Sequence, residues 1–227
     1  MKSAAVILAV SGLLAAGAAS AEDKLRCNSV SSDKDLSDIS LGVVSGRKVN
    51  FLANGYEKAG CPSADPSCKK PAFVRAKDKV VFDTDIAAGG YVCAVFVDRR
   101  GNETNGWLPA ANIKPVGVKP RWVGNWKWYS ASEIDIKRKP NDTAQVTGTA
   151  VHGEGGAATD GSIEAIIDLR QAVQGFALQG DKQVAYEQAG KYDCAVIMKQ
   201  LGRYLFVSDN KNCGGANVSF SGVYVKR

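Results

Sequence analysis

Apolar and polar residues alternate along much of the chain, which is typical of β-strands with one buried face. Near the C-terminal end, Val218, Phe220 and Tyr224 share one face of an extended segment. Gly222 interrupts this apolar row and indicates a bulge or a close approach of another segment. β-branched and aromatic runs bounded by turn residues predict strands at 48–52, 79–83, 91–98, 122–129, 133–137, 145–152, 183–187, 192–199, 204–208 and 217–226.

The segment 161–173 fits two periodicities. Alternate residues from Ile163 to Leu169 are apolar, as in a strand, whereas Ile163, Ile166 and Arg170 would share one side of a helix. We favour the strand. The whole pattern then predicts an all-β protein.

A connector divides this pattern into two parts. Residues 114–120 hold two prolines and a glycine between strand-like runs. We therefore expect two domains, residues 22–115 and 122–227, joined by a linker at 116–121. The second domain would hold about eight strands, which suffice for a small antiparallel β-barrel or sandwich.

The first 21 residues have the layout of a secretory signal peptide. Lys2 precedes an apolar stretch at 4–16, and the small residues Ala19 and Ala21 form a cleavage site. We expect cleavage after Ala21 and export to the periplasm or beyond. No other run approaches the roughly 20 apolar residues of a membrane-spanning helix, so no membrane span is expected.

All six cysteines follow this leader, so we expect them to meet an oxidising compartment and to pair. Four precede the connector and two follow it, and both numbers are even, as independent disulfide-closed domains require. The first four allow three pairings, of which we favour the one with a short proline-containing loop. The predicted disulfides are Cys27–Cys93, Cys61–Cys68 and Cys194–Cys213.

The stretch 89–98, followed by Gly106, Trp107 and Leu108 and then by a short run at 112–113, resembles the end of bacterial Src-homology-3-like domains. In that family a strand precedes a Gly-Trp-Leu step and a final short strand. The resemblance implies a small barrel in the first domain. It also implies a role in binding cell-wall peptides or proteins, and no catalytic chemistry.

In such barrels the binding groove lies between loops that carry partly exposed aromatic residues. The resemblance therefore makes Tyr91, Trp107, Arg99 and Arg100 candidates for ligand contacts. Trp107 is our first choice. The competing interpretation is that its ring fills the barrel core.

The C-terminal part begins with the run 122–126 and ends with the runs 205–210 and 213–224. This ending resembles small periplasmic bacterial β domains, some of which are joined to modules named for lysozyme inhibition. Its richest aromatic cluster is Trp122, Trp126 and Trp128, which share one face of a strand. This face is either core or a platform for sugars or a protein partner. Trp126 and Trp128 are therefore further ligand-binding candidates.

The sequence contains few residues of the types that catalysis or metal binding requires. His152 is the only histidine, and no unpaired cysteine is expected, so we name no catalytic residue, metal site or cofactor. Residues 209–212 offer oxygen atoms but lack the further carboxylates of a tight calcium site. We interpret them as a turn.

The formal net charge of +6 is spread over both parts of the chain and favours anionic partners only weakly. Short basic runs such as Arg47-Lys48 are typical of solvated turns, and with export this makes nucleic acid an unfavourable partner. We expect an exported, non-catalytic cell-envelope protein that binds peptidoglycan or a periplasmic or secreted protein. The alternative is an inhibitor of a secreted wall-degrading enzyme such as lysozyme, which the positive charge disfavours because animal lysozymes are basic.

Overall fold

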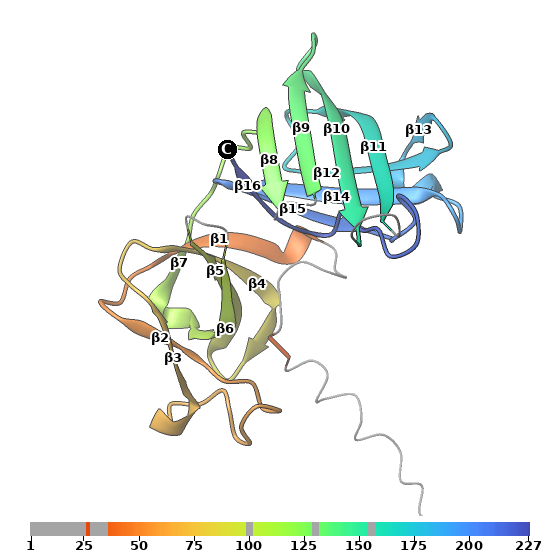
Figure 1. The fold of residues 1–227 in the computed structure, drawn as a ribbon. Helices are drawn as coiled ribbons and strands as arrows, with labels where there is room; N and C mark the ends of the chain where they lie inside the picture. Colours follow the sequence, from red (N-terminus) through yellow and green to blue (C-terminus); the bar gives the residue numbers. More distant parts are fainter. Residues whose placement is uncertain (1–25, 28–35, 99–101, 129–131, 154–157) are drawn as a thin grey trace, which may run out of the picture.

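The structure, a computed structural model, describes residues 26–27, 36–98, 102–128, 132–153 and 158–227. Among these residues the chain forms two antiparallel sheets, and its only helical elements are 3-10 turns of three residues each (Figure 1). The all-β class is therefore confirmed. The predicted signal peptide lies outside the described residues.

The N-terminal sheet has seven strands in the order β3-β2-β6-β5-β4-β1-β7, and it curls around its own core (Figure 1). A first cluster of buried residues, which includes Phe51, Val80 and Leu108, fills this curl. The 3-10 turn η2 (Leu36–Asp38) precedes the first strand, and η3 (Pro66–Cys68) and η4 (Ala110–Asn112) lie between later strands. The strands are β1 (Ile39–Val44), β2 (Val49–Leu52), β3 (Lys69–Val74), β4 (Lys79–Ala88), β5 (Tyr91–Val97), β6 (Glu103–Pro109) and β7 (Ile113–Pro115).

The C-terminal sheet has nine strands in the order β11-β10-β9-β8-β16-β15-β14-β12-β13 and is nearly closed into a barrel. One 3-10 turn, η6 (Tyr186–Gln188), follows β13. The strands are β8 (Gly124–Trp128), β9 (Ser132–Arg138), β10 (Thr143–His152), β11 (Thr159–Asp168), β12 (Val173–Gln179), β13 (Lys182–Val184), β14 (Cys194–Leu201), β15 (Tyr204–Asp209) and β16 (Gly222–Lys226).

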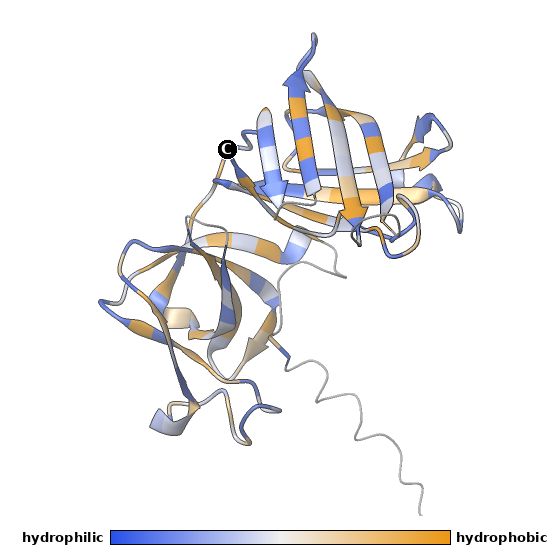
Figure 2. Cartoon of the chain, viewed as in Figure 1, coloured by the Kyte–Doolittle hydropathy of each residue, from blue (hydrophilic) through white to orange (hydrophobic). Residues whose placement is uncertain are grey.

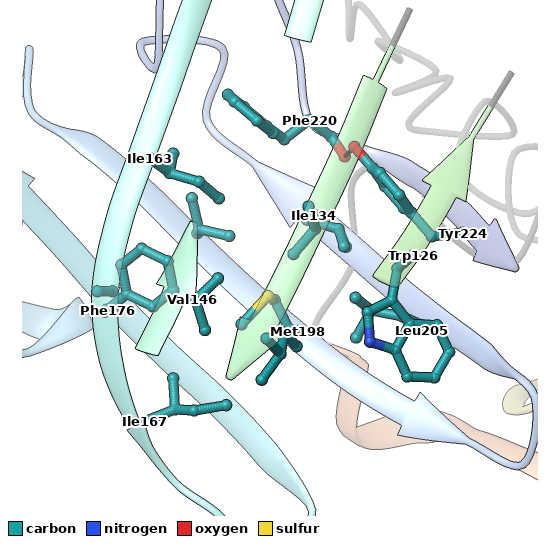
Figure 3. Packing of buried hydrophobic residues seen from close by; sticks show 14 of the residues in the cluster. Trp126, Ile134, Val146, Ile163, Ile167, Phe176, Met198, Leu205, Phe220 and Tyr224 are labelled. Atoms are coloured by element: carbon teal, nitrogen blue, oxygen red, sulfur yellow. Dashed lines mark hydrogen bonds between the residues drawn. The ribbon is translucent and has the colours of Figure 1, made fainter. Parts of the chain in front are cut away.

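Alternation along these strands separates core from solvent. In β11, Ile163, Ala165 and Ile167 are buried while the residues between them are exposed, so the strand predicted for this segment is confirmed. The same banding of apolar and polar residues is visible along β9 and β11 (Figure 2). Side chains from eight of the strands belong to one packed core. Met198 lies there among aliphatic and aromatic neighbours (Figure 3).

Side-chain amides bridge the seam between the two ends of the C-terminal sheet. Gln183 of β13 accepts a hydrogen bond from the backbone nitrogen of Ile166 at 2.7 Å and donates one to its carbonyl oxygen at 2.8 Å. Gln174 of β12 forms the same pair of bonds with Asp168, at 3.3 and 2.5 Å. These amides form hydrogen bonds with backbone groups of β11 that would otherwise pair with a neighbouring strand.

The segment before β16 departs from the predicted strand at 217–226. Val218 and Phe220 are buried as the alternation predicts, but Ser219 and Ser221 turn to the carboxylate of Asp209. Their hydroxyls donate to Asp209 Oδ1 at 2.6 and 2.5 Å, and the backbone nitrogen of Ser221 donates to it at 3.0 Å. These hydrogen bonds compete with strand pairing, so the regular strand begins only at residue 222.

The three predicted disulfides are present in the structure. Cys27–Cys93 joins the described N-terminal residues to β5. Each of the other two closes a shorter loop, with a sequence separation of 7 for Cys61–Cys68 and of 19 for Cys194–Cys213. Each disulfide stays within one sheet region, and the proposed independence of the two domains remains a prediction.

Candidate functional site

Trp107, our first choice for ligand binding, has no exposed surface. It lies on β6 directly opposite Cys93 and packs in a cluster with both disulfides of the N-terminal part. Its Nε1 atom donates to Oδ1 of the buried Asn54 at 3.0 Å. The groove prediction is thus corrected at this residue: the ring is part of the core, because its apolar body is enclosed and its one polar atom is satisfied.

The tryptophans of the C-terminal part are also packed. Trp126 has no exposed surface, and its Nε1 atom donates to the carbonyl oxygen of Trp122 at 2.8 Å. Trp128 is half-buried, with its ring centroid 6.1 Å from that of Tyr224. A Cβ atom at Gly222 would lie 2.6 Å from Cδ2 of Trp128, so the glycine marks the close approach suggested by its position. Of the two interpretations of this face, the structure supports the core.

The remaining predicted residues do not form a site with these tryptophans. Tyr91 is half-buried and packs against the cluster around Trp107. Arg99 and Arg100 lie outside the described residues. The side chains that the sequence singled out are therefore not brought together on one described surface.

The structure instead contains a cleft where the two sheets meet, enclosing about 630 Å³. Its apolar floor consists of Leu41, Val118, Leu201 and Tyr204. Five cationic side chains and no carboxylate line it. The cations are Lys79, Lys119, Arg121, Arg203 and Lys226.

The floor is built by the hairpin turn between β14 and β15, which reaches β1 of the other sheet. Gly202 adopts a φ of 67°, and a Cβ atom there would lie 3.4 Å from Leu41. Beside the turn, the hydroxyl of Tyr204 donates to the carbonyl oxygen of Val97 at 2.8 Å. The Nζ atom of Lys199 donates to the carbonyl oxygen of Ile39 at 2.7 Å. These contacts join β1 to the C-terminal sheet. In the ribbon, β1 lies on the side of the N-terminal sheet that faces the C-terminal sheet (Figure 1).

The linker forms one wall of the cleft, and hydrogen bonds to both sheets hold it in place. The backbone nitrogen of Val116 donates to the carbonyl oxygen of Leu41 at 2.9 Å. Further along, the backbone nitrogen of Arg121 donates to Oε1 of the buried Gln200 at 2.7 Å, and Lys226 Nζ donates to the carbonyl oxygen of Arg121 at 3.3 Å. The cations of the linker are therefore carried on a backbone with a defined position.

The electrostatics of the cleft favour an anion. Among the described residues, Lys79, Lys119 and Arg121 form no ion pair within 4.0 Å. Burial raises the pKa of Tyr204, so its phenol stays neutral at ordinary pH and keeps its hydrogen for Val97. The nearby carboxylates of Asp78 and Asp98 raise this pKa further, while Arg203 lowers it.

The lining contains no histidine, cysteine, serine or carboxylate. Its cations and apolar floor can therefore hold and orient an anionic ligand. Sequence reasoning missed this site, since its cations lie on β4, the linker, the β14–β15 turn and β16. Two lysines and an arginine within 114–121 were the only local signal.

A second polar surface lies on the outer face of β9, β10 and β11, where Glu133, Asp135 and Glu164 gather near hydroxyl side chains. Each of these carboxylates already has a partner: Glu133 pairs with Lys127, Asp135 with Lys137, and Glu164 accepts from Gln145. In the part of the chain that the structure describes, no three His, Cys, Asp or Glu side chains group closely enough to hold a metal ion.

None of the described helical turns is long and apolar enough to cross a membrane. Comparison with known proteins adds no assignment: no family model, curated protein or solved structure matches the chain.

Proposed function

We propose that this protein is an exported, non-catalytic binding protein of the cell envelope, and that the cleft between its sheets binds an anionic ligand. The observation that carries the proposal is the set of five cations around an apolar floor without a lining carboxylate. A volume of about 630 Å³ is within the range of small-molecule and short-peptide sites.

Export is supported by the three disulfides, because such bonds persist mainly in oxidising compartments. The signal-peptide pattern of the first 21 residues points to the same destination. In the envelope, the peptides of peptidoglycan combine free carboxylates with methyl groups. This chemistry matches cations such as Lys119 and Arg121 above Leu41 and Leu201.

The alternative, inhibition of a secreted wall-degrading enzyme, ranks second. A basic enzyme such as lysozyme would meet like charges at the cleft, and like charges slow and weaken association. An acidic protein partner would not meet this repulsion. In the test, binding to immobilised lysozyme is compared with binding to peptidoglycan, because lysozyme represents the wall-degrading enzymes of this alternative.

The experiment is co-sedimentation of the purified protein with isolated peptidoglycan sacculi over a range of salt concentrations. The test variant is Lys119→Glu with Arg121→Glu. The control is Lys182→Glu with Lys211→Glu, which makes the same charge change at exposed positions outside the cleft. We expect the test variant to bind at least about tenfold more weakly and the control to bind like the unmodified protein.

Equal sedimentation of the two variants would remove the cleft as the binding site. Retention on lysozyme without sedimentation on sacculi would favour the inhibitor instead. Melting curves for each variant separate loss of binding from loss of fold.

A further inference from the structure

A second basic surface lies at the turns of the N-terminal sheet. The turn between β1 and β2 lies beside the turn between β3 and β4, because β2 and β3 pair with Val49 opposite Val74. Two hydrogen bonds join the second turn to the end of β1: Lys77 N donates to Val44 O, and Val44 N donates to Asp78 O, both at 2.9 Å. Side chains from both turns therefore lie close together on one surface.

We name this surface the basic turn patch and define it as Arg47, Lys48, Phe73, Arg75 and Lys77. Its four cations are exposed and form no ion pair within 4.0 Å among the described residues. One carboxylate, that of Asp78, belongs to the same turn. Its Oδ2 atom accepts a hydrogen bond from the backbone nitrogen of Arg75 at 2.7 Å, so it serves the turn itself.

Phe73 stands among these cations on the edge strand β3 with 36% of its surface exposed. The Nζ atom of Lys48 lies 4.5 Å from the ring centroid, and the guanidinium carbon of Arg75 lies 5.2 Å from it. Such contacts attract the cations to the face of the ring. The ring edge is then the part of Phe73 left for another partner.

We infer that the basic turn patch docks on an anionic lipid bilayer, with its cations at the phosphate headgroups and the edge of the Phe73 ring at the acyl boundary. Basic residues beside an exposed aromatic ring are the combination that membrane interfaces select. A sugar polymer fits less well, because sugars stack on aromatic faces and cations already occupy the face of this ring. The inference goes beyond the proposed function, since none of the five patch residues lines the cleft.

The test is co-sedimentation of the full protein with vesicles of phosphatidylglycerol mixed into phosphatidylcholine, and with vesicles of phosphatidylcholine alone. We expect binding to the anionic vesicles only, and weaker binding at higher salt. Each cation near an anionic surface contributes on the order of a fivefold affinity gain. Lys48→Gln with Arg75→Gln should therefore weaken binding roughly 25-fold.

Two further variants separate the ring and the cleft from the patch charges. Phe73→Thr keeps a strand-forming residue and every charge, and it should still weaken vesicle binding severalfold because the ring no longer enters the interface. Lys119→Gln with Arg121→Gln should leave vesicle binding within about twofold of the unmodified protein, whether or not sacculus binding is lost. The matched control for charge is Lys182→Gln with Lys211→Gln.

Equal binding to neutral vesicles would overturn the inference, as would unchanged binding of the Lys48 and Arg75 variant. Full binding by a folded Phe73→Thr protein would also overturn it, since the patch would then act only as a general polyanion surface. A soluble anionic polysaccharide that binds more tightly than the anionic vesicles would have the same consequence. Circular dichroism and melting curves verify that each variant is folded.

Discussion

Trp107 and Asn54 form a buried pair in the N-terminal sheet, in which the indole Nε1 donates to the amide Oδ1 at 3.0 Å. The same oxygen accepts from the backbone nitrogen of Cys27 at 2.7 Å. One amide oxygen thus joins strand β6 to the disulfide-bonded N-terminal segment. The side chain of Asn54 is needed because it satisfies two donors that water cannot reach.

Substitution at this pair should destabilise the N-terminal sheet. Trp107→Ala should lower the free energy of unfolding by about 3–5 kcal/mol through the cavity that it leaves. Asn54→Ala leaves two buried donors unpaired, at about 1–3 kcal/mol each. Asn50→Ala is the matched control, because this half-buried asparagine makes one side-chain hydrogen bond among the described residues, to Lys70 O. The loss of that bond should cost about 1 kcal/mol. Urea titration followed by tryptophan fluorescence measures all three, and equal losses at Asn54 and Asn50 would contradict the assignment.

The disulfides of the N-terminal sheet should differ in their contribution to stability. Cys27 and Cys93 are 66 residues apart in sequence, whereas Cys61 and Cys68 are 7 apart. In the chain-entropy model the longer loop stabilises by about 4 kcal/mol and the shorter by about 2.5 kcal/mol. Paired serine variants, compared by denaturant midpoint under oxidising conditions, should follow this order. The reverse order would show that the short loop supports structure beyond its own closure.

The seam of the C-terminal sheet should open when Gln183 is replaced. Gln183→Ala removes both hydrogen bonds to the backbone of Ile166, so the Ile166 amide should exchange with deuterium faster and stability should fall by about 1 kcal/mol. Gln145→Ala is the control, since Gln145 bonds the side chain of Glu164 between strands whose backbones are already paired. Unchanged exchange at Ile166 would argue against the amide bridge.

The junction between the sheets should loosen when Tyr204 loses its hydroxyl. Tyr204→Phe removes the hydrogen bond to Val97 O at a cost of about 1 kcal/mol, and Lys199→Met removes the bonds to Ser37 O and Ile39 O. Trypsin should then cleave the linker after Arg121 faster in the double variant, whereas Pro120 blocks cleavage after Lys119. Tyr186→Phe, at a partly exposed tyrosine outside the junction, should leave this rate unchanged.

Asp168 should titrate at unusually low pH. Hydrogen bonds from the side chain and backbone of Arg170 lower its pKa from 3.8 to about 2. Because the folded pKa is depressed, the stabilisation is present above pH 3.8 and is lost as the pH falls through about 2. In Arg170→Ala the pKa should return toward 3.8, as measured by NMR titration of the Asp168 carboxyl. An unchanged pKa would assign the shift to another cause.

Sequence periodicity located many of the strands because alternation reports directly on burial. It identified β11 from the run Ile163 to Leu169, and it placed Val218 and Phe220 in the core even where the chain leaves regular strand geometry. It did not reveal β1. Leu41 packs on the junction between the sheets, while Gly42 and Val44 face the core of the N-terminal sheet. Both faces of this strand are therefore buried, and the alternation is blurred.

The cysteine pairing was also accessible from the sequence, because the even number of cysteines on each side of the linker and the short loop between Cys61 and Cys68 left few possible pairings. The environment of Trp107 was not accessible from the sequence. A tryptophan after glycine has the same local sequence pattern in a core as in a binding groove. Whether its ring can be buried depends on a hydrogen-bond partner for its Nε1 atom, which Asn54 supplies here.

The composition and periodicity of the chain determined an all-β, disulfide-linked protein with a mild excess of positive charge. Only the tertiary structure decided where that charge converges. Lys79, Arg121, Arg203 and Lys226 are distant in sequence and share the cleft because the β14–β15 turn packs on β1 and the linker passes beside both. The local sequence pattern does not predict such contacts, because they depend on how the two sheets pack against each other.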